Sequence, residues 1–155
     1  MIPNLKLKIG GGYTNKDKRF LKKVKNILKP YMKDVEISNN YRLEDHAGFY
    51  RSVSVICVPL RIEEGVGLYL CEAFAAGRPA VVPATGSFPE IAGEAGILYY
   101  PNESSALAEA LYKILSDKIL YARTAQKANE LSSIRYNDSV VAEKLTKLYK
   151  LSAIN

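Results

Sequence analysis

The chain has 155 residues, 48% of them hydrophobic, which is enough to fill the core of one domain. Its 22 Lys and Arg residues exceed its 16 Asp and Glu residues, and the formal charge of +6 would suit phosphate, an anionic membrane face or nucleic acid. The single histidine, His46, excludes a zinc site made of several histidines, and we expect it at an exposed helix position. Cys57 and Cys71 lie in apolar runs without metal-ligand spacing, which predicts buried, reduced thiols.

No part of the sequence approaches the roughly 20 apolar residues of a membrane-spanning helix. The N-terminus also lacks a basic segment followed by an apolar stretch, the pattern of a secretory signal. We therefore expect a cytoplasmic protein.

The first sixty residues alternate between predicted strands and helices. Residues 5–9 read as a strand that runs into Gly10, Gly11 and Gly12, where the backbone can turn or approach a ligand. Apolar residues at steps of three and four predict an amphipathic helix over residues 15–32. The next expected elements are a strand at 35–37, a turn at Asn39 and Asn40, a helix at 43–52 and a buried strand at 53–58.

Much of the positive charge lies on the first predicted helix. Its basic residues are Lys16, Lys18, Arg19, Lys22, Lys23, Lys25, Lys29 and Lys33. A solvated helix face explains this pattern. The alternative is a surface that lies against anionic lipid at the cytoplasmic membrane face, for which a basic amphipathic helix is sufficient.

The rest of the chain continues the alternation and then becomes helical. A helix over residues 67–76 is expected to end at Gly77, with Pro79 as a stop. The remaining expected elements are strands at 80–83 and 96–100, separated by a loop, and helices at 104–116, 117–132 and 137–151. This order predicts an α/β fold with a parallel sheet covered on both faces.

The segment after the strand at 53–58 is the expected ligand site, because ligands bind beyond the carboxyl ends of parallel strands. Gly65 and Gly67 precede a helix whose backbone N–H groups can meet an anion. Glu72 has apolar neighbours on every side in that helix, so its carboxylate needs strong partners. An ion pair with Arg78 or a pair of sugar hydroxyls would satisfy it. Glu64 is either another acceptor for hydroxyls or a solvated loop residue.

Glu64 and Glu72 together form a Glu-x7-Glu pattern, which resembles that of GT-B fold glycosyltransferases, in particular glycosyltransferase family 4, the glycosyl transferases group 1. The resemblance continues through the whole run from Glu64 to Pro79. The segments Phe88-Pro89-Glu90-Ile91 and Ala95-Gly96-Ile97-Leu98 are also similar to those that this family places next. Similarity then covers nearly the whole chain.

The resemblance implies a Rossmann-like, three-layer α/β/α domain with about five parallel strands and C-terminal helices. Residues 1–155 are expected to form one domain, the donor-binding half of the enzyme without its first strand and helix and without its N-terminal acceptor domain. In the family the absent strand would lie between the strands at 5–9 and 53–58. Direct pairing of these two gives the expected strand order 2-1-3-4-5, and the alternative is an open gap filled by a partner strand.

The resemblance also implies a role for each site residue. Glu72 would hold the ribose hydroxyls of a nucleotide-sugar, and Glu64, as the catalytic residue, would contact the transferred sugar. The other implied donor-binding residues are Gly65, Val66, Gly67 and Leu68 through their amides, Tyr41 and Arg42 over the base, and Gly11 and Gly12 at the end of the first strand.

The implied reaction is transfer of a sugar, with retention of configuration, from a UDP- or GDP-sugar to an acceptor, with no metal or other cofactor. The implied partners are the nucleotide-sugar and an acceptor-binding domain or chain, but no nucleic acid. The last helix, which in the family crosses back to the other domain, is expected here either to pack loosely or to join a second copy in a homodimer. The alternative is a non-catalytic nucleotide-sugar-binding module or subunit that is inactive alone.

Overall fold

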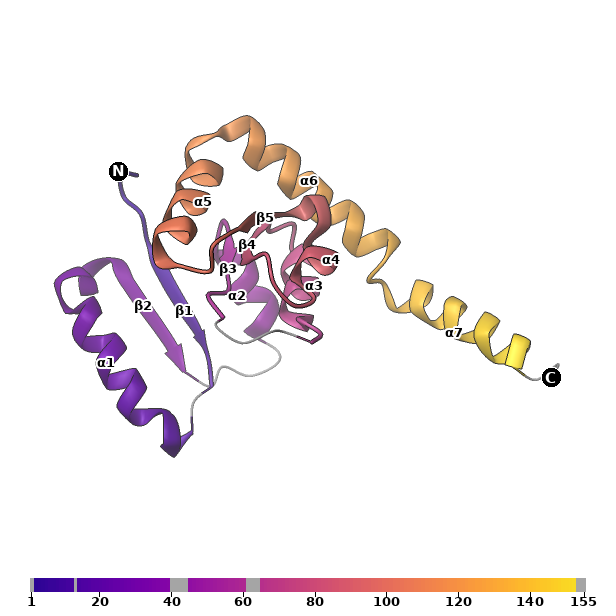
Figure 1. Ribbon diagram of the computed structural model, residues 1–155, viewed down its shortest axis with the longest axis horizontal. Helices are drawn as coiled ribbons and strands as arrows, with labels where there is room; N and C mark the ends of the chain where they lie inside the picture. The colour runs from indigo at the N-terminus through magenta and orange to yellow at the C-terminus, as the bar shows by residue number, and fades with distance from the viewer. Residues whose placement is uncertain (1, 13, 40–44, 61–64, 153–155) are drawn as a thin grey trace. The chain divides into compact units, whose positions relative to one another are not determined.

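The computed structural model describes residues 2–12, 14–39, 45–60 and 65–152 (Figure 1). The chain divides into two compact units, Met1–Val53 and Ser54–Asn155. Each unit is described by itself.

The first unit is a parallel βαβ motif followed by a short helix. β1 and β2 are hydrogen-bonded neighbours, with Leu7 opposite Val35 and Gly11 opposite Asn39. The elements of this unit are β1 (Leu7–Gly11), η1 (Asn15–Asp17), α1 (Lys18–Leu28), η2 (Lys29–Asp34), β2 (Val35–Asn39) and α2 (His46–Ser52).

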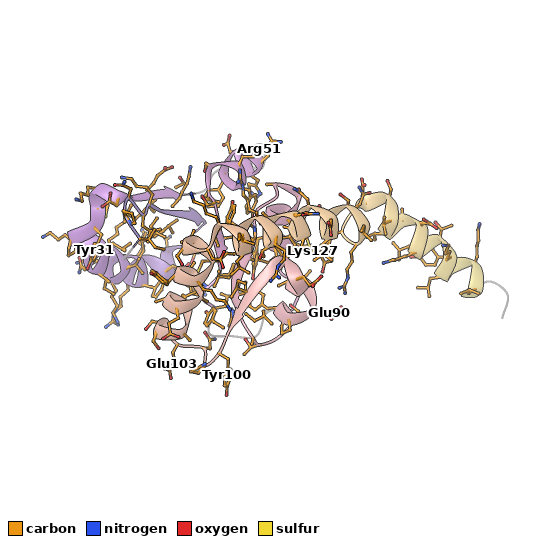
Figure 2. All side chains as sticks on the ribbon, turned by 90° about the horizontal axis from the view of Figure 1, so that it is seen from above. Tyr31, Arg51, Glu90, Tyr100, Glu103 and Lys127 are labelled. Carbon is orange, nitrogen blue, oxygen red and sulfur yellow. The ribbon has the colours of Figure 1, made fainter. Side chains whose placement is uncertain are left out.

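Little of this unit is buried. Tyr50 of α2 is the only apolar side chain with less than a tenth of its surface exposed among the residues described here. Tyr31 of η2, by contrast, is 62% exposed (Figure 2). Lys8 of β1 forms an ion pair with Glu36 of β2 at 3.1 Å. Lys6 and Asp34, which directly precede the two strands, form another at 2.8 Å.

The second unit contains a three-stranded parallel sheet in the order β3-β4-β5, with Ile56 opposite Ala80 and Ala80 opposite Gly96. All four residues of β4 are buried, as expected for a central strand with both faces covered. The elements that build this unit around the sheet are β3 (Ile56–Cys57), α3 (Leu68–Ala75), β4 (Ala80–Pro83), α4 (Phe88–Ala92), η4 (Gly93–Ala95), β5 (Gly96–Tyr99) and α5 (Ser104–Ser116).

Helices cover both sides of this sheet. Figure 1 shows α5 on one side and α3 and α4 on the other. Val81 and Tyr99 of the sheet form a buried cluster with Ala110 and Ile114 of α5. Neighbouring strand residues point to opposite faces, so Val82, which is fully buried, belongs to the other layer. The three-layer α/β/α arrangement is therefore present in this unit.

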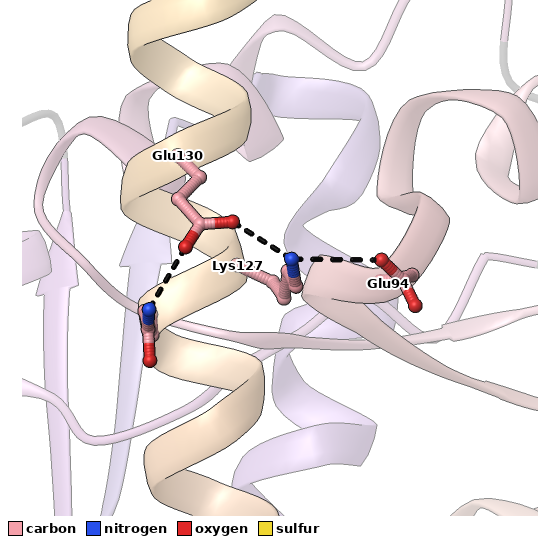
Figure 3. Close-up of polar contacts among 4 residues, drawn as sticks. Glu94, Lys127 and Glu130 are labelled. Atoms are coloured by element: carbon pink, nitrogen blue, oxygen red, sulfur yellow. Dashed lines mark hydrogen bonds and ion pairs between the residues drawn. The ribbon is translucent and has the colours of Figure 1, made fainter.

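Two further helices complete the second unit. α6 (Lys118–Ile134) packs against α3 and η4, and α7 (Asp138–Ser152) follows it. Lys127 of α6 lies 2.8 Å from Glu130 and 3.9 Å from Glu94 of η4 (Figure 3). Beyond α6, Arg135 pairs with the Glu90 carboxylate at 2.8 Å, which ties the end of this helix to α4.

The expected single sheet of five strands is wrong. The described strands form two sheets, β1-β2 and β3-β4-β5, so the neighbours within each sheet agree with the predicted order but the first and third strands are not paired. Apolar composition shows that a strand is buried, and it does not show which strand lies beside it.

Three local expectations also need correction. The loop expected between the strands at 80–83 and 96–100 contains α4 and η4, because Pro89 lies in the first turn of α4, where its missing N–H costs nothing. β1 extends through Gly11 and β2 through Asn39, since ladder hydrogen bonds need only the backbone. β3 covers only two residues of the expected strand at 53–58.

Candidate functional site

The start of α3 is shaped by a buried glycine. Gly67 is the N-cap residue and has left-handed dihedral angles, with φ of 61° and ψ of 41°, which favour glycine over other residues. The Leu70 N–H donates to the Gly67 carbonyl at 2.9 Å and closes the first turn. Because Gly67 has no side chain, no side-chain cap is made at this end, where the helix dipole concentrates positive charge.

Glu72 lies on the exposed face of α3. It shares that face with Leu68 and Ala75, which stand four residues before it and three after it. Leu70, Ala73 and Phe74, on the other side of the helix, are fully buried. The expectation that apolar neighbours surround the Glu72 carboxylate is therefore wrong, because Leu68 is itself 66% exposed. One exposed stripe thus carries a carboxylate and an apolar side chain one turn apart.

A Schellman motif ends α3 and fixes its length. Gly77, with φ of 67°, donates its N–H to the Phe74 carbonyl at 2.9 Å, and the Arg78 N–H donates to the Ala73 carbonyl at 2.9 Å. Pro79 follows and is fully buried. The end predicted at Gly77 is confirmed, and the helix passes directly into β4.

The structure places the predicted site residues in different parts of the chain. Gly65 and Val66 are exposed before α3, Gly67 is buried, and Leu68 opens the helix. Gly11 and Gly12 lie at the end of β1 in the first unit, where both are exposed. Glu64, Tyr41 and Arg42 fall outside the described residues, so their predicted roles stay predictions.

Asn102 is a residue that the sequence gave no reason to select. Its side-chain amide donates to the Leu60 carbonyl at 2.8 Å, and the Tyr99 hydroxyl donates to its Oδ1 atom at 3.3 Å. Asn102 thus joins the end of β5 to the segment that follows β3. Burial raises the pKa of Tyr99, which keeps this hydroxyl protonated as a donor. Its neighbour Tyr100 is 80% exposed and projects from the molecule (Figure 2).

The thiols and the histidine complete the set of titratable groups singled out above. Both cysteines are free and partly buried, and burial raises the pKa of Cys57 to about 11 and that of Cys71 in the same direction. His46 is half-buried at the start of α2, so its expected exposed position is wrong.

Neither a metal site nor a membrane span is found in the described part of the chain. Across residues 2–12, 14–39, 45–60 and 65–152, no three His, Cys, Asp or Glu side chains come together as metal ligands would. Over the same residues, none of the helices combines the length and the apolar character needed to cross a bilayer.

Comparison with known proteins identifies relatives of this chain. The family described as glycosyl transferases group 1 matches residues 2–117. A phosphatidyl-myo-inositol mannosyltransferase of Mycobacterium leprae is 36% identical over 109 residues, which are 69% of this chain and 29% of that protein. The chain therefore spans less than a third of that relative.

Solved structures share the fold. The C-terminal domain of a glycosyl transferase group 1 family protein, LpcC of Francisella tularensis, matches with a TM-score of 0.75 and 20% identity, over 86% of this chain and 87% of that one. Anabaena HepE in complex with UDP matches with a TM-score of 0.85 and 21% identity, over 98% of this chain and 42% of that one. With the family match over most of its length, the chain belongs to the glycosyl transferases group 1.

Proposed function

We propose that this chain supplies the donor-binding half of a retaining glycosyltransferase, with the nucleotide-sugar held along the exposed face of α3. The observation that carries the proposal is the pairing of Glu72 with an uncapped, glycine-led helix start one turn away. This pairing offers a carboxylate for hydroxyls and a positive helix end for phosphate within one element. The UDP bound to Anabaena HepE makes UDP the first nucleotide to test.

In this proposal α3 and the segment before it act on different parts of the donor. The Glu72 carboxylate accepts hydrogen bonds from the two ribose hydroxyls. The backbone at Gly65, Val66, Gly67 and Leu68 faces the sugar and the diphosphate, where the helix dipole stabilises the charge of the leaving nucleoside diphosphate. Glu64, in the segment just before, contacts the transferred sugar. An acceptor-binding domain, in the same chain or another one, completes the reaction.

Calorimetric titration with UDP, GDP, ADP and their common sugars tests the proposal. Replacing Glu72 with Gln removes a charged acceptor, and we expect donor binding to weaken by about 1.5 to 3 kcal/mol. Glu109→Gln is a matched control, because Glu109 is an exposed residue of α5 outside the proposed site. The control should bind as the parent chain does.

Two results would redirect the proposal. Unchanged affinity with a lower melting temperature in Glu72→Gln would make Glu72 a structural ion-pair residue, for which Arg78 is the candidate partner. Donor binding without sugar transfer, even when acceptor-domain candidates are supplied, would instead support the non-catalytic binding module.

A further inference from the structure

The positive charge of this protein is concentrated in one stretch of the first unit. Residues 16–34 hold eight basic and two acidic side chains, a net charge of +6 that equals the formal charge of the whole chain. The remaining 14 basic residues are balanced by 14 acidic ones. The excess charge is therefore a property of α1 and its flanking turns, and it is not spread over the surface.

The two acidic residues of this stretch already have partners. The Asp17 carboxylate accepts hydrogen bonds from the Thr14 N–H at 2.8 Å and from the Thr14 hydroxyl at 2.7 Å, which hold its pKa below the ordinary value. Asp34 pairs with Lys6 at 2.8 Å. None of the eight basic residues forms an ion pair with another residue that the structure describes. Their charge is available to an external partner.

Large apolar side chains stand among these cations. Phe20 and Ile27 lie two turns apart on α1 and are 70% and 71% exposed, and Tyr31 follows in η2 at 62%. Lys23 stands between the first two along the helix. Two surface hollows of about 400 and 300 Å³, both lined by Lys25, lie on the other side of α1 from Phe20 and Ile27. Phe20, Lys23 and Ile27 thus share one side of α1, with Arg19 one turn from Lys23, so cationic groups and apolar surface adjoin there.

We propose that this face, formed by α1 and η2, docks on the surface of an anionic phospholipid bilayer. Lysine and arginine would attract the headgroup phosphates while Phe20, Ile27 and Tyr31 enter the boundary with the acyl chains. Nucleic acid would use the same cations, but it offers no apolar layer for an aliphatic side chain such as Ile27. The exposed apolar residues therefore favour the lipid surface.

Vesicle sedimentation with the whole chain tests this docking. We expect binding to vesicles of phosphatidylglycerol and phosphatidylcholine in equal amounts, little binding to phosphatidylcholine alone, and release when salt rises from about 0.1 M to about 0.5 M. Arg19→Glu with Lys23→Glu, on the side of α1 that carries Phe20 and Ile27, should weaken partitioning by at least about 25-fold, since each cation near such a surface contributes roughly fivefold. Phe20→Ser with Ile27→Ser should weaken it by at least about tenfold.

A charge-matched control separates this face from net charge. Lys113→Glu with Lys118→Glu changes the total charge equally at exposed positions of α5 and α6, so it should keep most of the binding. Circular dichroism verifies that each variant is folded. The proposal is overturned if the chain does not bind anionic vesicles, or if the control variant loses as much vesicle binding as the α1 variants. It is also overturned if the chain binds duplex DNA with an affinity that Phe20→Ser with Ile27→Ser leaves unchanged.

Discussion

At the scale of a single residue, Gly77 shows how one backbone conformation sets the end of a helix. Its φ of 67° is strained for any residue with a side chain, and an added Cβ would lie 3.0 Å from the Asn129 amide nitrogen. We therefore expect Gly77→Ala to lower the free energy of unfolding of the second unit by about 1 to 2 kcal/mol. Urea denaturation followed by circular dichroism measures this change.

The control for this prediction is the same substitution at Gly48 of α2. An added Cβ there meets nothing within 4 Å, so Gly48→Ala should be neutral or stabilise its helix by about 0.5 to 1 kcal/mol. If Gly77→Ala proved as harmless as Gly48→Ala, the left-handed turn after α3 would not be required.

Cys57 gives the second unit a pH dependence of known sign. Burial raises the pKa of its thiol from 9.0 to about 11, so the folded protein holds this proton more tightly than the unfolded chain does. The stability due to the neutral thiol is complete below pH 9 and is lost as the pH rises towards 11. The loss attributable to Cys57 should be on the order of 2 kcal/mol.

Unfolding titrations between pH 8 and pH 11 measure this loss when the parent chain is compared with Cys57→Ala. The variant should show a shallower decline in the free energy of unfolding, whereas Cys71→Ala should keep the contribution of Cys57. Parallel pH profiles for the parent chain and Cys57→Ala would show that burial does not perturb this thiol.

At the scale of the element, the sequence predicts best those helices and strands that begin or end at a residue with a known capping or helix-stopping role. The strand at 80–83 agrees with β4 at both ends, and the helix at 104–116 agrees with α5. α6 begins after Asp117, whose carboxylate accepts hydrogen bonds from the Ile119 and Leu120 N–H groups at 2.9 Å. Gly77, Pro79 and Asp117 are stop and start signals that need no tertiary information.

Elements whose limits depend on packing were predicted less well. α4 was missed because Pro89 stops a helix in its interior but suits its first turn. Glu72 was expected among apolar side chains because Leu68 and Ala75, which share its exposed stripe, are apolar residues on an exposed face. The donor site stays a prediction that the family resemblance carries, whereas the exposure of Glu72 and the bridge made by Asn102 needed coordinates.

At the scale of the whole molecule, the burial of side chains differs sharply between the two units. Tyr50 is the one buried apolar residue described in the first unit, whereas Leu70, Phe74, Val82 and Phe88 are all fully buried in the second. The alternation of strands and helices predicted an α/β fold, but it does not report how much core each part contains. Burial of apolar surface is the main stabilising contribution, so the two units should differ in stability.

Hydrogen exchange should show this difference along the chain. Backbone amides open locally with free energies that follow the buried contacts around them, so the amides of β1 and β2 should exchange well before those of β4. Mass spectrometry of peptides from the native protein measures both rates in one sample, and Gly77→Ala should speed exchange in β4 without changing it in β1 or β2. If the amides of the three strands exchanged at equal rates, and Gly77→Ala changed those rates together, the units would open as one cooperative body. In that case the first unit would owe its stability to the core of the second.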